Sequence, residues 1–168
     1  MALSMYGASV PVFTRALGNL SGLLAKGLAS AEARDFDPAV LVSARLAPDM
    51  LPLSGQVQIA TDTAKGAAAR LTGTEAPSWP DTETTFPELQ ARIKLAIDHL
   101  QSFTPAQFEG AEERTVILPL PNGELKFSGE QFLFAFALPN FFFHVTTAHA
   151  ILRHNGVPIG KMDFLGAP

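Results

Sequence analysis

The chain has 168 residues, of which 47% are hydrophobic and 17% are charged, and its formal net charge is −4. This composition excludes a disordered protein and fits one globular domain over residues 1–168, while the acidic balance argues against binding to nucleic-acid phosphates. The sequence contains no cysteine, which excludes disulfides, cysteine-ligated zinc and thiol nucleophiles and fits a cytoplasmic protein.

A first helix is predicted over residues 6–28, where apolar side chains recur at steps of three and four. This stripe consists of Tyr6, Val10, Phe13, Leu17, Leu20, Leu24 and Leu28. Pro11 indicates a kink or a late first turn. The basic residues Arg15 and Lys26 interrupt the segment instead of preceding it, unlike those of a signal peptide. We therefore expect a bundle helix, and no membrane span anywhere, because no run reaches about 18 uninterrupted apolar residues.

A second helix is predicted to begin near Asp37-Pro38, to restart after Pro48 and to end at Gly73 in a left-handed cap. Its apolar seam is Leu53, Val57, Ala60, Ala64, Ala67 and Leu71. Asp49 and Gln56 are seven positions apart, which places both on one face of this helix beside the seam. They are interpreted either as a helix-start charge with a solvated flank or as groups that face His144 across the bundle.

A third helix follows the Pro- and Thr-rich loop 73–85. Its stripe is Phe86, Leu89, Ile93, Ile97 and Leu100, and we expect Glu88 and Arg92 to pair one turn apart on its outer face. A β-hairpin comes next, because Asn122-Gly123 separates two runs of strand-forming residues.

The fourth helix is predicted from the capping box Ser128–Gln131 to about Asn155, with a bend at Pro139. Arg153 and His154 in the last turn and Gly156 beyond them mark its end. The helix is apolar on all sides, which is typical of a buried position. The three phenylalanines 141–143 cannot all face one core, so at least one ring should project toward a neighbouring helix, a partner subunit or a ligand cavity. The elements together predict an all-α four-helix bundle with a short hairpin between helices three and four.

Asn140 and His144 lie one turn apart in this apolar helix. A buried imidazole must be hydrogen-bonded or functional. One interpretation is a structural histidine bonded to Asn140, to Thr147 or to a group on the second helix. The other is a ligand or proton donor that lines a pocket beside the bend.

The histidine spacing argues against a metal site, so no metal and no cofactor are predicted. His144 and His149 are five positions apart and diverge around the helix, and Ala148 stands where a second ligand would be. His99 and His154 lie elsewhere, and the second helix has no histidine.

Three segments carry a resemblance over nearly the whole chain: PNFFFH…TTAHAILRHNGV..GKMDFLG, ARLAPDM…QVQIATDTAKG..ARL and FPELQARI. Together they resemble an uncharacterised domain-of-unknown-function family grouped with the DinB/YfiT-like four-helix bundles. The resemblance implies an up-down-down-up bundle and a homodimer. The wider superfamily includes metal-dependent enzymes, some acting with small thiols, that use one histidine on helix two and an H-x-x-x-H pair on helix four. Only His144 matches that pattern.

We therefore favour a small-ligand-binding or non-catalytic protein with an incomplete metal site and no assigned catalytic residue. Its candidate pocket consists of Asn140, His144, Gln56 and Asp49. The alternative is a divergent metal-dependent hydrolase or thiol-transferase that uses His144 together with carboxylate or amide groups. A third hypothesis is a purely structural dimer. The expected partners are a second copy of the chain and a small molecule, with no nucleic acid and no membrane.

Overall fold

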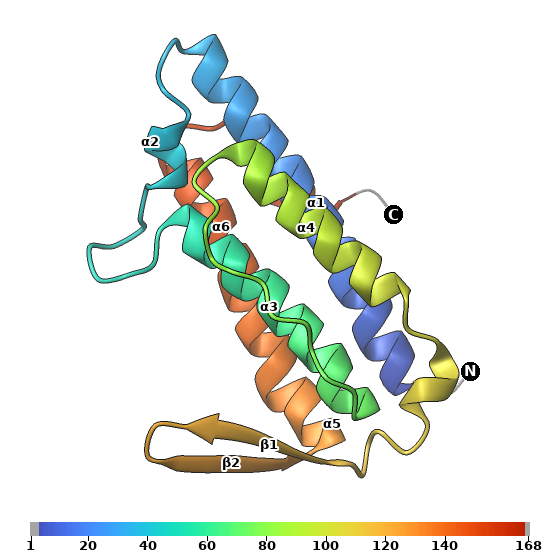
Figure 1. The fold of residues 1–168 in the computed structure, drawn as a ribbon. Helices are drawn as coiled ribbons and strands as arrows, with labels where there is room; N and C mark the ends of the chain where they lie inside the picture. Colours follow the sequence, from blue (N-terminus) through green and yellow to red (C-terminus); the bar gives the residue numbers. More distant parts are fainter. Residues whose placement is uncertain (1–3, 167–168) are drawn as a thin grey trace.

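The computed structural model describes residues 4–166, and it is mostly helical with one small two-stranded hairpin, as the sequence predicts. The long helices are α1 (Met5–Ala33), α3 (Leu53–Thr72), α4 (Phe86–Gln101) and α6 (Leu138–His154). Helix α1 packs against α4 and α6, and α3 packs against the same two helices (Figure 1).

The predicted apolar stripes meet in one core. Every residue of the α3 seam is fully buried, and its three alanines let the neighbouring helices approach closely. On α1, Phe13, Leu17, Leu20 and Leu24 are fully buried, and on α4 so are Leu89, Ile93 and Leu100. Periodicity therefore identified the inward faces of these helices correctly.

The second predicted helix differs from the expectation at its start. Only Ala39–Val42 (α2) is helical before a loop over residues 43–52, and α3 begins at Leu53 after Pro52. Asp49 therefore lies in the loop and shares no helix face with Gln56. The predicted end is confirmed, because Gly73 caps α3 with a left-handed φ of 71°.

The fourth predicted helix is built from three consecutive segments. The capping box at Ser128 starts α5 (Gly129–Gln131), and a π-helical segment, η2 (Phe132–Ala137), then leads into α6. The π-helical segment stands immediately before Pro139, where the sequence predicts a bend. Proline cannot donate a hydrogen bond to the preceding turn, and a widened turn is one way in which a helix continues past it.

The phenylalanine run at the start of α6 divides between core and surface. Phe141 is fully buried against Phe13, with ring centroids 4.9 Å apart, whereas Phe143 is 55% exposed. As predicted, the three rings do not all face the core, and Phe143 is the one that lies mostly outside it.

The hairpin joins α4 to α5 through the short 3-10 turn η1 (Pro105–Phe108) and crosses the end of the helices (Figure 1). Strands β1 (Thr115–Leu120) and β2 (Gly123–Ser128) are antiparallel and pair Leu118 with Leu125. The Asn-Gly hairpin prediction is confirmed. Val116 and Leu118 are buried against the core, which attaches the hairpin to the helices.

A short C-terminal helix, α7 (Lys161–Leu165), was not predicted from the sequence. It packs on α1, where Asn19 Nδ2 donates to the Phe164 carbonyl at 3.0 Å and Lys26 pairs with Asp163.

Among the described residues, one helical stretch, Gly129–His154, is long and apolar enough to cross a membrane by length and composition. The core helix of a soluble protein passes the same test. The α6 part of this stretch packs against α3 and α1, so its contacts are those of a core helix.

Candidate functional site

The candidate site is a hydrogen-bonded pair between α6 and α3. His144 Nδ1 lies 2.7 Å from Gln56 Oε1, and Gln56 Nε2 donates to the Leu51 carbonyl at 2.9 Å. Gln56 is 1% exposed and His144 is 8% exposed. Of the three partners considered for a structural His144, the structure gives the group on the second predicted helix.

These two contacts determine which imidazole nitrogen carries the proton. The bond to the Leu51 carbonyl orients the Gln56 amide, so its oxygen faces the imidazole. An amide oxygen only accepts, and His144 Nδ1 must therefore donate. In the neutral ring this leaves Nε2 with a free lone pair, and Nε2 has no hydrogen-bond partner in the part of the chain that the structure describes.

Burial in an apolar environment lowers the pKa of His144 below its ordinary value, because the charged form is poorly solvated there. The imidazole is therefore neutral at pH 7. Because Nδ1 of the neutral ring donates to Gln56, Nε2 can only accept a hydrogen bond. The ring therefore does not act as a general acid at this pH.

Acidification is expected to lower the free energy of unfolding through His144. Its folded-state pKa lies below the unfolded value of about 6.5, so the unfolded chain binds the proton first as the pH falls. Stability is therefore full above the unfolded pKa and decreases as the pH falls below it. Urea unfolding at pH 7.5 and pH 5.5 measures the loss. We expect a smaller loss in His144→Asn than in the exposed control His154→Asn, and equal losses would contradict this account.

Asn140 forms no hydrogen bond with His144. Its Nδ2 donates to Thr63 Oγ1 on α3 at 2.9 Å, and Thr63 lies seven residues, about two turns, after Gln56. Thr147 is also occupied, because its hydroxyl donates to the Phe143 carbonyl at 2.7 Å. The two amide side chains, Gln56 and Asn140, therefore link α3 to α6 through separate hydrogen bonds.

Asp49 is the candidate residue that the structure places farthest from the expectation. It is exposed in the loop before α3, and it forms no hydrogen bond or ion pair with His144 or Gln56. The prediction placed it on a helix that in fact begins four residues later, at Leu53. Its connection to the site is the loop itself, which supplies the Leu51 carbonyl to Gln56.

Within residues 4–166, no group of three His, Asp or Glu side chains is arranged to hold a metal ion. His149 Nε2 lies 3.3 Å from the Gly160 carbonyl, away from His144. His144 Nε2 is thus a single potential ligand, with Ala148 at the next position on its helix face.

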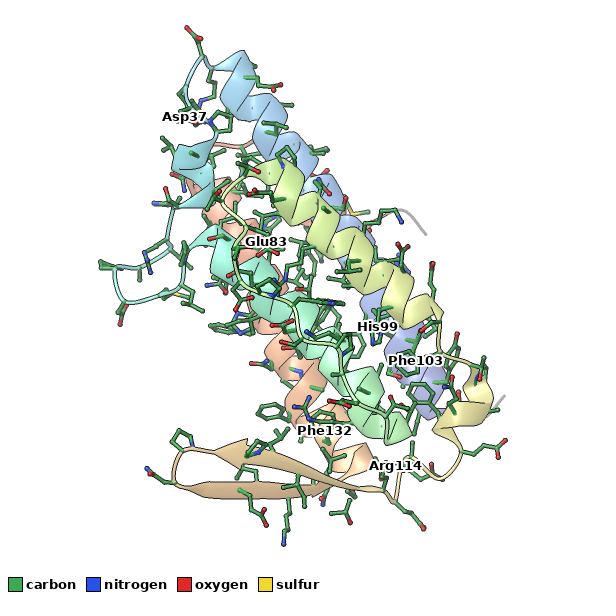
Figure 2. All side chains as sticks on the ribbon, viewed as in Figure 1. Asp37, Glu83, His99, Phe103, Arg114 and Phe132 are labelled. Carbon is green, nitrogen blue, oxygen red and sulfur yellow. The ribbon has the colours of Figure 1, made fainter. Side chains whose placement is uncertain are left out.

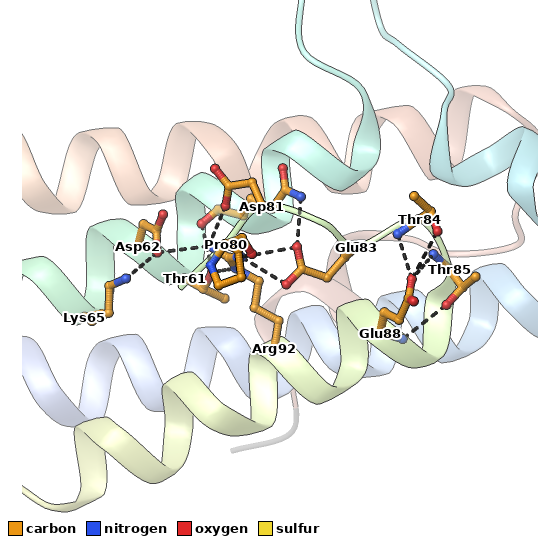
Figure 3. Close-up of polar contacts among 11 residues, drawn as sticks. Thr61, Asp62, Lys65, Pro80, Asp81, Glu83, Thr84, Thr85, Glu88 and Arg92 are labelled. Atoms are coloured by element: carbon orange, nitrogen blue, oxygen red, sulfur yellow. Dashed lines mark hydrogen bonds and ion pairs between the residues drawn. The ribbon is translucent and has the colours of Figure 1, made fainter. Parts of the chain in front are cut away.

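A second polar cluster, which the sequence analysis missed, lies between α3, α4 and loop 73–85 (Figure 3). The Arg92 side chain lies at the centre of this cluster and is 1% exposed. Its Nε donates to Thr61 Oγ1 at 2.9 Å, and its Nη1 donates to Glu83 Oε1 at 3.0 Å. Its Nη2 lies 3.0 Å from Asp62 Oδ1 and 2.9 Å from Asp81 Oδ1.

The predicted pair of Glu88 with Arg92 is wrong. Glu88 instead caps the start of α4, where its carboxylate accepts from the backbone amides of Thr84 at 2.8 Å and Thr85 at 2.9 Å. A signal for the inward position of Arg92 was present in the sequence. Arg92 lies three residues after Leu89, next to Ile93 and four before Ala96, which is the buried stripe itself.

Aromatic and cationic side chains extend this cluster along α3 and α4. Lys65 Nζ lies 2.7 Å from Asp62 Oδ1 and 4.1 Å from the centre of the Trp79 ring. His99 packs edge-on against Trp79 and Phe103 (Figure 2). Burial, and then the charge of Lys65, lower the pKa of His99. The cluster holds loop 73–85 onto the helices.

The comparisons with known proteins agree with this architecture. The chain matches the family described as a domain of unknown function (DUF1993) over residues 5–165. It is similar to the crystal structure of a DinB family member protein from Shewanella denitrificans, with 43% sequence identity and a TM-score of 0.90. That match covers 98% of this chain and 93% of the other. The comparison with curated proteins found no match. Family match and structural similarity together show that this chain belongs to the DUF1993 domain family of DinB-like proteins.

Proposed function

We propose that this protein binds a small molecule at His144 without catalysing a reaction. The observation that carries the proposal is the state of the imidazole: Nδ1 is committed to Gln56, and Nε2 has no partner in the described part of the chain. An unpartnered acceptor on a mostly buried side chain favours a ligand that donates an O–H or N–H group. Gln56 and Asn140 complete the proposed site, and Asp49 belongs to the exposed loop whose Leu51 carbonyl accepts from Gln56.

Binding is tested with 15N-histidine-labelled protein and a panel of small alcohols, phenols and primary amides. A ligand of the proposed kind shifts the Nε2 resonance of His144 and raises the thermal unfolding midpoint. His144→Asn should lose both responses, and His154→Asn should keep them. A panel that leaves the His144 resonance unchanged would count against the proposal.

The alternative, a divergent metal-dependent hydrolase or thiol-transferase, has one observation in its favour. Metal-ligating histidines usually donate their other ring nitrogen to an oxygen, as His144 Nδ1 does toward Gln56. Further ligands would have to come from Asp49 or from bound molecules. Elemental analysis of protein purified without chelator separates the two functions. Stoichiometric zinc or nickel that disappears in His144→Asn would favour the enzyme, and its absence would favour the non-catalytic protein.

We also propose an up-down-down-up bundle that forms a cytoplasmic homodimer. The direction of the chain in Figure 1 supports the topology, since α1 and α6 run one way and α3 and α4 the other.

The exposed Phe143 and the family resemblance support the proposed homodimer. Light scattering that gives a monomer mass would contradict it.

A further inference from the structure

A groove of about 330 Å³ lies where α3, β1 and the π-helical segment η2 meet, apart from His144. Its lining includes Asp62, Thr63, Arg70, Leu118, Phe132 and Phe136. Figure 2 places Phe132 at the junction of the helices with the hairpin. The volume falls within the usual range of about 300–1,000 Å³ for small-molecule sites.

Arg70 is the charged group at one end of this groove, and it has no ion-pair or hydrogen-bond partner in the part of the chain that the structure describes. Loss of hydration lowers the pKa of its guanidinium. Its Nη1 lies over the bare backbone of Gly66, only 2.4 Å from where a β-carbon would be. A glycine inside a helix is destabilising, but the missing side chain of Gly66 leaves the space that the Arg70 guanidinium occupies.

Five other residues of the lining are apolar: Leu118, Pro119, Phe132, Phe136 and Ala137. Phe132 and Phe136 stack with ring centroids 6.0 Å apart, and Leu118 of β1 lines the same groove. At the other end, Asp62 is already paired with Lys65 and with Arg92. Eight residues of helix separate Asp62 from Arg70, which is about 12 Å at 1.5 Å per residue.

From this arrangement we infer that the groove binds a small monocarboxylate with an apolar body, such as a medium-chain fatty acid. The guanidinium of Arg70 binds the carboxylate through two parallel hydrogen bonds, and the chain lies along Phe132, Phe136 and Leu118. Among the described residues, the groove is lined by one unpaired cation, Arg70, and by the carboxylate of Asp62, and this balance favours a ligand with a single negative charge over a phosphate dianion. The inference stands apart from the proposed function at His144.

Octanoate is the probe, with octylamine as the matched ligand of opposite charge, and calorimetric titration gives the affinity. Arg70→Gln should weaken octanoate binding at least about tenfold, because a charge-assisted hydrogen bond is lost. The exposed Arg153→Gln removes the same charge elsewhere and should leave the affinity unchanged. No octanoate binding to the wild type, or unchanged binding in Arg70→Gln, would overturn the inference. So would octylamine that binds as tightly as octanoate.

Gly66→Ala is the second variant. Its β-carbon displaces only the end of the flexible Arg70 side chain, so the helix should gain stability while octanoate affinity falls at least about tenfold. His144→Asn distinguishes the two sites. It should leave octanoate binding unchanged, whereas loss in His144→Asn together with retention in Arg70→Gln would assign the ligand to His144 and refute the groove.

Discussion

Replacing Arg92 by alanine is expected to lower the free energy of unfolding by about 3–5 kcal/mol, the range for removing one partner of a buried ion pair. The guanidinium is buried, and Thr61, Glu83 and the Pro80 carbonyl all accept hydrogen bonds from it. Removing it leaves these acceptors without a donor inside the protein, and it also releases loop 73–85 from α4.

The charge on Glu83 makes this loss large. Burial alone would raise the pKa of Glu83, but hydrogen bonds from Gln58 and Arg92 and the charge of Arg92 outweigh it, so the pKa is lowered. Glu83 is therefore ionised at pH 7. In Arg92→Ala its carboxylate, 13% exposed, becomes a mostly buried anion without its cation.

Urea unfolding at pH 7 measures the effect, with Asp81→Ala as the control. Asp81 contacts the same guanidinium but is 58% exposed, so its removal should cost under about 1 kcal/mol. Arg92→Lys should fall between the two variants, because an ammonium keeps the charge but cannot reach all of the acceptors. A loss below about 1 kcal/mol in Arg92→Ala would show that the cluster is not a stabilising element.

The parts of the fold that the sequence predicted are those set by local rules. The seam of α3 follows the helical period, Gly73 supplies a left-handed cap, and Ser128 begins the last helix with its own side chain. The Asn-Gly pair determines the hairpin turn in the same way. Each of these features depends on residues within a few positions of one another, so the local sequence is enough to predict it.

The site depends on contacts between distant residues, which periodicity does not give. His144 and Gln56 are 88 positions apart. The sequence placed each near the core, but the register between two helices decides that they meet. Asn140 was expected beside His144 and instead donates to Thr63 on α3, which lies seven residues, about two turns, after the His144 partner Gln56.

Arg92 shows how a correct pattern was interpreted wrongly. A charged residue four positions after Glu88 on a helix is most often a solvated pair, and this rule outweighed the position of Arg92 in the buried stripe. The acids that neutralise Arg92 come from α3 and from loop 73–85. Their convergence is a property of the folded loop, which has no periodic signal.

Gly129→Ala is expected to destabilise the protein by about 3 kcal/mol or more, at or beyond the upper end for overpacking. Gly129 begins α5 directly after the hairpin, and a β-carbon there would lie 1.7 Å from the Ala111 carbonyl oxygen. That oxygen belongs to the backbone and cannot rotate away. The next residue, Glu130, donates its amide to the Glu112 carbonyl at 3.0 Å, so the two segments are joined where they would have to separate.

Gly22→Ala is the matched control for this substitution, because it adds the same methyl group in the middle of α1. Outside the adjacent backbone of α1 itself, no atom lies within 4 Å of a β-carbon at Gly22, so only the helix preference of alanine acts, and the stability should rise by about 0.5–1 kcal/mol. Urea unfolding of both variants should therefore give changes of opposite sign. A Gly129→Ala protein as stable as the wild type would mean that the segment at Ala111 and Glu112 is not held rigidly against the start of α5.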